Sequence, residues 1–165
     1  MENKQLINEM LDAIEDGDVE KVMALLNSDV DKLNLITPFG TWLHIAASEG
    51  QLDIVKKLID LGVDINKRGG TYDGGAINSA ASEGHIEIVK YLLSNGAELD
   101  VSEPTRNPLF GAIMSGNINI AKVLIDNGIN TKIKYTGENM TNTDAYAFAI
   151  ERGQKDIAEL IKRDR

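Results

Sequence analysis

The two histidines are the first residues in this chain of 165 residues that could do chemistry. His44 lies in the stretch TWLHIAASEG, three residues after Thr41, so the two side chains can meet on one face of a helix. A histidine that acts as a general base needs a nucleophile or an acid beside it, and the sequence offers none near His44. We therefore expect His44 and Thr41 to have a structural role, and we expect no enzymatic activity.

Metal and phosphate sites are the next candidates. His85 is far from His44 in the sequence, and two separated histidines are too few ligands for a metal ion. The glycine-rich stretch GGTYDGG at 69–75 lacks the G-x-x-x-x-G-K-[ST] pattern of a phosphate-binding loop, and no strand precedes it. The chain contains no cysteine, which excludes disulfides and thiolate ligands. We expect no metal or cofactor, and we interpret residues 69–75 as a tight turn.

The charge of the chain narrows the class of partner. The formal net charge is −9 and the isoelectric point is about 4.7. Such a chain has no basic surface with which to displace counterions from a nucleic acid or to dock on an anionic membrane. The N-terminus lacks the pattern of a signal peptide, and no apolar run approaches the roughly 20 residues of a membrane span. The default expectation is a cytoplasmic protein that binds neither nucleic acid nor membrane.

A repeat organises the chain. One glycine recurs at intervals of 32 to 37 residues, and in the three central units a second glycine follows it by 12 residues. Apolar residues fall four, five, eight and nine positions after the first glycine, which is one face of an amphipathic helix. A short alanine-rich run precedes that glycine, so each unit is predicted to be two antiparallel helices. The first glycines are Gly17, Gly50, Gly84, Gly116 and Gly153, and the second are Gly62, Gly96 and Gly128.

The pattern T-x-L-H-I-A-A-x-x-G, followed by D-I-V-x-x-L-I-x-x-G-V-D-I-N, resembles the ankyrin repeat. The resemblance implies an all-α solenoid, a single domain of five helix–turn–helix units with hairpin loops and polar end caps. It implies that the histidine at position 44 hydrogen-bonds Thr41 and the nearby backbone. The expected units are approximately residues 1–33, 34–67, 68–100, 101–132 and 133–165.

The units depart from the family pattern at several positions. Trp42 stands where the family has proline, and Asn78 stands at the histidine position of the third unit. We therefore expect the threonine–histidine pair only in the second unit. Extra residues between Gly128 and Asp144 make the last hairpin loop longer than the others.

Acidic residues precede the first three recurring glycines, at Asp16, Glu49 and Glu83. In a stack of ankyrin units this position lies on the concave side, so these residues are predicted to form a column of negative charge. Such a row is either a solvated face or a docking surface for a basic partner, and the sequence leaves both open. Hairpin tips would extend the surface, with Trp42 and Tyr72 as aromatic anchors, although Trp42 could instead pack at the hairpin base. The remaining predicted tip residues are Thr37, Pro38, Phe39, Thr71, Asp73, Glu103, Pro104 and Arg106.

Members of the ankyrin family are overwhelmingly protein-binding scaffolds. The resemblance therefore implies a non-enzymatic module that binds another protein, with its concave face and hairpin tips as the expected contact surface. Two alternatives stay open. The first is a stand-alone inhibitor of the immunity or antitoxin type that masks a basic enzyme, and the second is a self-associating assembly scaffold. The oligomeric state is left open, with a monomer expected for the chain alone.

Overall fold

Helices dominate the computed structural model, which describes residues 3–164 of the chain. One two-stranded sheet is inserted before the last two helices of this part. The elements are α1 (Asn3–Glu15), α2 (Val19–Leu26), α3 (Val30–Leu33), α4 (Trp42–Ser48), α5 (Leu52–Asp60), α6 (Ala76–Glu83), α7 (Ile86–Ser94), α8 (Pro108–Ser115), α9 (Ile118–Asp126), β1 (Tyr135–Gly137), β2 (Met140–Thr143), α10 (Ala145–Glu151) and α11 (Lys155–Asp164).

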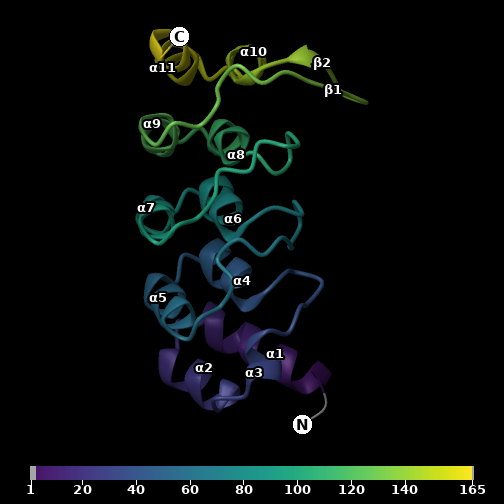
Figure 1. Cartoon of the computed structure of the whole chain (residues 1–165), viewed down its shortest axis with the longest axis vertical. Helices are drawn as coiled ribbons and strands as arrows, with labels where there is room; N and C mark the ends of the chain where they lie inside the picture. Colours follow the sequence, from purple (N-terminus) through teal and green to yellow (C-terminus); the bar gives the residue numbers. More distant parts are fainter. Residues whose placement is uncertain (1–2, 165) are drawn as a thin grey trace.

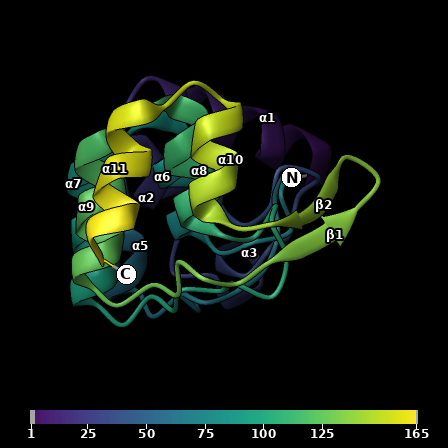
Figure 2. The same ribbon diagram turned by 90° about the horizontal axis from the view of Figure 1, so that it is seen from above.

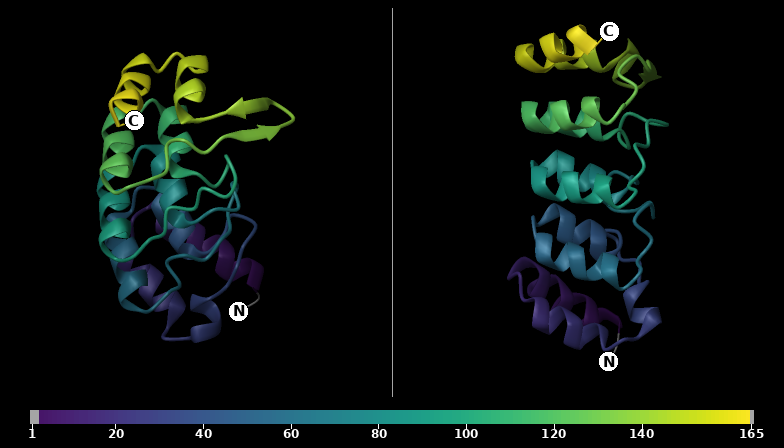
Figure 3. Two further views of the ribbon diagram at one scale, coloured as in Figure 1. Left: turned by 45° about the horizontal axis from the view of Figure 1, so that its top comes forward. Right: turned by 60° about the vertical axis from the view of Figure 1, so that its left-hand side comes forward.

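Helix pairs stack on one another along the long axis of the molecule (Figure 1). The first helices of the pairs, α1, α4, α6, α8 and α10, form an inner layer, and the second helices, α2, α5, α7, α9 and α11, form an outer layer. The loops that join one pair to the next project to one side of the inner layer (Figure 2). The arrangement confirms the predicted all-α solenoid, and each pair packs only on its neighbours, as in other repeat proteins (Figure 3).

Helix starts follow the capping residues of the sequence. The side chains of Asn107 and Asp144 accept hydrogen bonds of 2.9 Å from the backbone N–H groups of Leu109 and Ala147, at the first turns of α8 and α10. These bonds satisfy donors that have no partner inside the helix. Pro108, which lacks an N–H, occupies the first position of α8, where none is needed. Local sequence therefore fixes where the inner helices begin.

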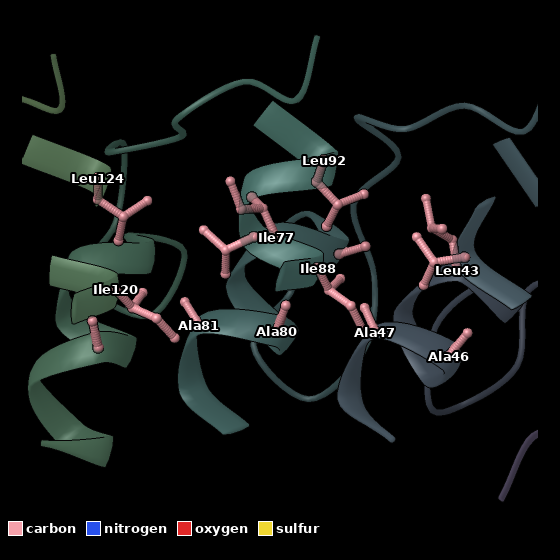
Figure 4. Close-up of a cluster of buried hydrophobic side chains, with 14 of the residues drawn as sticks. Leu43, Ala46, Ala47, Ile77, Ala80, Ala81, Ile88, Leu92, Ile120 and Leu124 are labelled. Atoms are coloured by element: carbon pink, nitrogen blue, oxygen red, sulfur yellow. The ribbon is translucent and has the colours of Figure 1, made fainter. Parts of the chain in front are cut away.

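The core lies between the two helix layers and between neighbouring pairs. Alanines of the inner helices α4 and α6 are fully buried, and Figure 4 shows four of them in one row of buried side chains with isoleucines and leucines of the outer helices. Small side chains let the inner helices approach closely. The outer helices contribute the bulk, since each fully buried isoleucine or leucine stabilises the fold by about 1.5–3 kcal/mol. The alanines are Ala46, Ala47, Ala80 and Ala81.

Two of the connecting loops close as tight hairpins. Thr37 and Gly40 pair across the turn that precedes α4, and Gly69 pairs with Gly74 before α6. The turn interpretation of residues 69–75 is therefore confirmed.

The last hairpin differs from the others because its extra residues form β1 and β2. These antiparallel strands extend away from the helices (Figure 3). Tyr135 anchors the strands: its hydroxyl donates to the carbonyl of Val101 at 2.8 Å and accepts from Asn107 Nδ2 at 3.0 Å. The all-α prediction omitted this small sheet, which the longer loop forms by pairing its own backbone.

No helix within residues 3–164 has the length and apolar character needed to cross a membrane.

All eight recurring glycines have positive φ, between 67° and 89°. Gly50 carries a second constraint. A Cβ at this position would lie 2.6 Å from the ring of His85, whose Nε2 lies 2.8 Å from the Ser48 carbonyl in the preceding unit. A Cβ at Gly62, which has a similar φ of 86°, would meet nothing within 4 Å. Gly50 is thus required both for its backbone angle and for the contact between units.

Comparing Gly50→Ala with Gly62→Ala separates these two requirements. Gly62→Ala should lower the free energy of unfolding by about 1–2 kcal/mol, the cost of a left-handed alanine. Gly50→Ala should cost at least about 1 kcal/mol more, because it also displaces His85. Chemical denaturation monitored by circular dichroism measures both. The added His85→Ala change should shrink the excess cost of Gly50→Ala, and equal losses for the two glycine variants would contradict the steric argument.

Candidate functional site

A pocket of 330 Å³ opens on the concave side, between the inner helices α1, α4 and α6 and the two hairpin turns near them. Leu11 and Ile45 contribute apolar surface, Ser48 and Ser79 contribute hydroxyl groups, and Phe39 and Tyr72 approach from the hairpins. Three glutamates line the same pocket, namely Glu15, Glu49 and Glu83. We call this the acidic pocket.

The three glutamates come from three successive inner helices, at or just after the last residue of each. All three are exposed, and no Lys, Arg or His within residues 3–164 forms an ion pair with them. The predicted column included Asp16 in place of Glu15. Glu15, the last residue of α1, lines the pocket, whereas Asp16 is exposed in the turn that follows and stays a predicted contact residue.

The carboxylates do not converge on one point. No group of three or more Asp, Glu or His side chains in the described part of the chain is arranged to hold a metal ion. Carboxylates that do not surround one point are better suited to a ligand with several positive charges, or to a long cationic side chain, than to a single metal ion.

His44 lies at the back of the acidic pocket and is itself buried. The backbone N–H of Thr41 donates to its Nδ1 at 3.2 Å, and the Thr41 hydroxyl lies 2.8 Å from the same nitrogen. Since Nδ1 accepts, the proton of the neutral ring is on Nε2, which donates to the Gly74 carbonyl at 2.9 Å. Burial lowers the pKa of His44, and the bond to Gly74 opposes that shift only in part. His44 therefore links the second unit, in which it lies, to the hairpin of the third unit.

Asn78 occupies in α6 the position that His44 occupies in α4. Its Nδ2 donates to the Thr105 carbonyl in the next hairpin at 2.6 Å, so an amide replaces the imidazole as the link. Its Oδ1 is buried and has no hydrogen-bond partner in the described structure. The alignment of the repeats identified the substitution, but the unsatisfied oxygen depends on the surroundings and could not be predicted.

The predicted aromatic anchors have different surroundings. Tyr72 is 40% exposed and Phe39 is 57% exposed, both at the edge of the acidic pocket. Trp42 is 0% exposed, and its indole N–H donates to the Lys32 carbonyl at 2.8 Å. Of the two alternatives for Trp42, the exposed anchor was wrong, and the structure shows the buried side chain of the second alternative. Its ring packs beneath the hairpin, because the short helix α3 provides a carbonyl that the indole can reach.

Among the predicted charged tip residues, two bind each other. Arg106 Nη2 lies 2.6 Å from Asp73 Oδ2, and Arg106 Nε donates to the Asp73 carbonyl at 3.1 Å. This pair ties the third hairpin to the fourth. Glu103 is exposed near the start of the same turn and does not line the acidic pocket. Asp73 and Arg106 therefore position the hairpins, while Glu103 stays an untested prediction.

Comparison with known protein families bears on the whole stack. A family model described as ankyrin repeats (three copies) matches residues 10–103 and, in a second match, residues 77–164. The chain belongs to the ankyrin repeat family. A search of curated proteins found no match. Ankyrin repeats are general protein–protein interaction modules, and the family is typically non-catalytic.

The environment of His44 in this ankyrin stack predicts a pH-dependent stability. Because its pKa is lowered on folding, the unfolded chain binds a proton more readily than the folded chain as the pH falls below about 6.5. The stability that neutral His44 contributes is present above that pH and is lost on acidification. The loss from this group should reach up to about 1.4 kcal/mol per pH unit.

The variant His44→Asn tests this, since Asn78 shows that an asparagine can make the same link. Urea unfolding between about pH 7 and pH 5 should give a steeper decline for the native chain than for His44→Asn. His44→Ala should lower the free energy of unfolding by about 1 kcal/mol or more at neutral pH, since it removes the buried hydrogen bond to the Gly74 carbonyl, which keeps only its bond from the Gly69 N–H. Parallel pH profiles for the native chain and His44→Asn would rule out titration of His44 as the cause.

Proposed function

We propose that this ankyrin-repeat protein binds a basic partner protein, with the acidic pocket at the centre of the contact. The observation that supports the proposal is the pocket's composition. Three carboxylates that form no ion pair within residues 3–164, Glu15, Glu49 and Glu83, line one pocket together with the two exposed aromatic side chains Phe39 and Tyr72.

Electrostatics favours a cationic ligand at this site. Repulsion among like charges from neighbouring inner helices is relieved when a partner brings positive charge to them. The net charge of −9 adds a long-range attraction that accelerates the encounter with a basic protein. The same field repels nucleic acids and anionic membranes.

Phe39 and Tyr72 suit the same ligand. A lysine or arginine side chain that enters the pocket could contact either ring, and each cation–π contact contributes about 0.5–2 kcal/mol. Exposed aromatic residues near the centre of a contact surface also tend to dominate its binding energy. The acidic pocket therefore combines charge and aromatic surface in a form that fits arginine or lysine side chains on a protein.

The double variant Glu49→Lys, Glu83→Lys tests the proposal. In a pull-down from lysate of the native organism, read by mass spectrometry, the native chain should retain a basic protein. The amount of this protein retained by the double variant should be lower by about tenfold or more, because repulsion replaces attraction. Added salt should weaken retention by the native chain.

A matched control is Asp60→Lys, Glu98→Lys, which changes the net charge equally at exposed positions outside the acidic pocket. This control should retain the partner nearly as well as the native chain does, with unchanged helicity for both variants. Equal loss in both variants would assign the effect to net charge alone. Retention of only a second copy of the chain would favour the self-associating scaffold, and the identity of a captured enzyme would decide for an inhibitor.

A further inference from the structure

The residues at the ends of the five inner helices change sign along the stack. They are Glu15, Glu49, Glu83, Ser115 and Arg152, each at or just after the last residue of its helix. The first three are acidic and line the acidic pocket, the fourth is neutral, and the fifth is basic. We call these five residues the helix-end row. Its charge runs from negative at α1 to positive at α10, the two ends of the inner layer in Figure 1, so the row has a direction.

The charge of the whole chain follows the same order. Acidic residues outnumber basic residues more than twofold in residues 1–100, whereas the two kinds are nearly equal in number in residues 101–165. The chain therefore does not offer a uniformly negative surface to a partner. A ligand that carries only positive charge gains attraction at the first three units and meets repulsion from Arg152 at the fifth.

The guanidinium of Arg152 is held in place with its donors free. It lies over the ring of Phe148, with Cζ 5.0 Å from the ring centroid, and that ring stacks in turn on Phe110 with the centroids 4.5 Å apart. A contact with the face of a ring uses none of the five N–H donors of a guanidinium. Arg152 is exposed, and its side chain forms no ion pair or hydrogen bond within residues 3–164. These donors are available for a planar anion such as a carboxylate, which can accept two of them in parallel.

Two arginines of the hairpins already have such an anion. Arg68 Nη2 lies 2.8 Å from Asp100 Oδ2, and Arg106 Nη2 lies 2.6 Å from Asp73 Oδ2. Both pairs join the hairpin of one unit to that of the next. Arg152 has the same donors and an aromatic support, but its carboxylate has to come from another molecule.

The glutamates of the helix-end row are too far away to supply it. Stacked units are separated by roughly 8–10 Å, so Glu83, two units from Arg152, lies roughly 16–20 Å away along the stack. Ser115, between them, carries no charge, and its hydroxyl donates to the carbonyls of Ala81 and Ala112, each at 3.2 Å. The negative and positive parts of the row are therefore separate contact points for one ligand.

We propose that the partner segment on the concave face carries charges of both signs: basic side chains contact Glu15, Glu49 and Glu83, and an aspartate or glutamate farther along the segment pairs with Arg152. This inference rests on the proposed function and adds the order of the partner's charges. A segment that lay in the opposite direction would bring like charges together at both ends of the row. Arg152 thus determines the direction in which the partner binds.

The row also sets the spacing of the partner's charges. The acidic side chain should lie roughly 16–20 Å from the nearest basic one, which corresponds to about five or six residues of an extended chain.

A basic residue just after a helix also stabilises the C-terminal end of that helix. This structural role concerns α10 alone and predicts no preference for a carboxylate in a ligand. A readout of ligand preference, separate from stability, therefore distinguishes the two roles.

Selection from a library of random peptides displayed on phage tests the inference on the isolated chain, with peptides of about 15 residues so that an extended peptide spans the five units. Peptides selected by the native chain should carry basic residues and, at a constant separation on one side of them, an aspartate or glutamate. The variant Arg152→Glu should select a basic residue at that position instead. The matched control is Arg163→Glu, an equal change of charge at an exposed arginine of α11 outside the row, which should select the same pattern as the native chain.

A selected peptide then permits a double-mutant cycle. Arg152→Gln should weaken binding of the peptide about three- to tenfold, the effect of one charge-assisted pair at a partly exposed site. It should not weaken binding of the same peptide with its carboxylate replaced by an amide. Fluorescence anisotropy of labelled peptides at low ionic strength measures the affinities, and circular dichroism verifies that each variant is folded.

Two results would overturn the inference: selection of basic peptides without any acidic preference, or the same acidic preference in the native chain and in folded Arg152→Glu. Both leave the proposed function intact, because basic residues would still be selected. The variant Glu49→Lys, Glu83→Lys should lose the basic preference and keep the acidic one. Selection of no basic residues by the native chain would instead contradict the proposed function itself, and this inference with it.

Discussion

A side-chain hydrogen bond to the hairpin of the next unit recurs in the second and third units of the stack. In the second unit, His44 Nε2 donates to the carbonyl of Gly74, and in the third, Asn78 Nδ2 donates to that of Thr105. Each bond holds the hairpin of the next unit against the first turn of the preceding inner helix. Because each bond joins a side chain of one unit to the hairpin backbone of the next, it stabilises the position of both.

The later units hold their hairpin by a different contact. Phe110 stands at the histidine position of the fourth unit and packs against Tyr135 and Phe148, with ring centroids 5.2 Å and 4.5 Å away. Aromatic packing, with the hydroxyl of Tyr135 bonded to Val101, replaces the polar link. The side chains beside the hairpins therefore differ along the stack: carboxylates lie near the first units, and aromatic rings lie near the last.

The walls of the acidic pocket depend on these hydrogen bonds. The His44 bond keeps the hairpin that bears Tyr72 beside α4 and α6, which encloses the carboxylates of the acidic pocket. The Asn78 bond and the Arg106–Asp73 ion pair hold the following hairpin to the third unit. Because these bonds hold the pocket walls in place before a ligand binds, binding requires little reorganisation of the free protein, which favours affinity.

The sequence by itself determined the repeat, the helix pairs and the stacking, because recurring glycines, caps and apolar spacing act locally and repeat at each unit. It also predicted Glu49, Glu83 and Tyr72 as surface residues of one face, since equivalent positions in a stack align.

Tertiary structure decided the contacts that depend on neighbouring units. It placed Glu15 in the pocket in place of Asp16 and buried Trp42 against the carbonyl of Lys32. It paired Asp73 with Arg106, and it left Asn78 Oδ1 unsatisfied beside Gly111. Such contacts join residues of different units, and no local pattern specifies which atoms will meet.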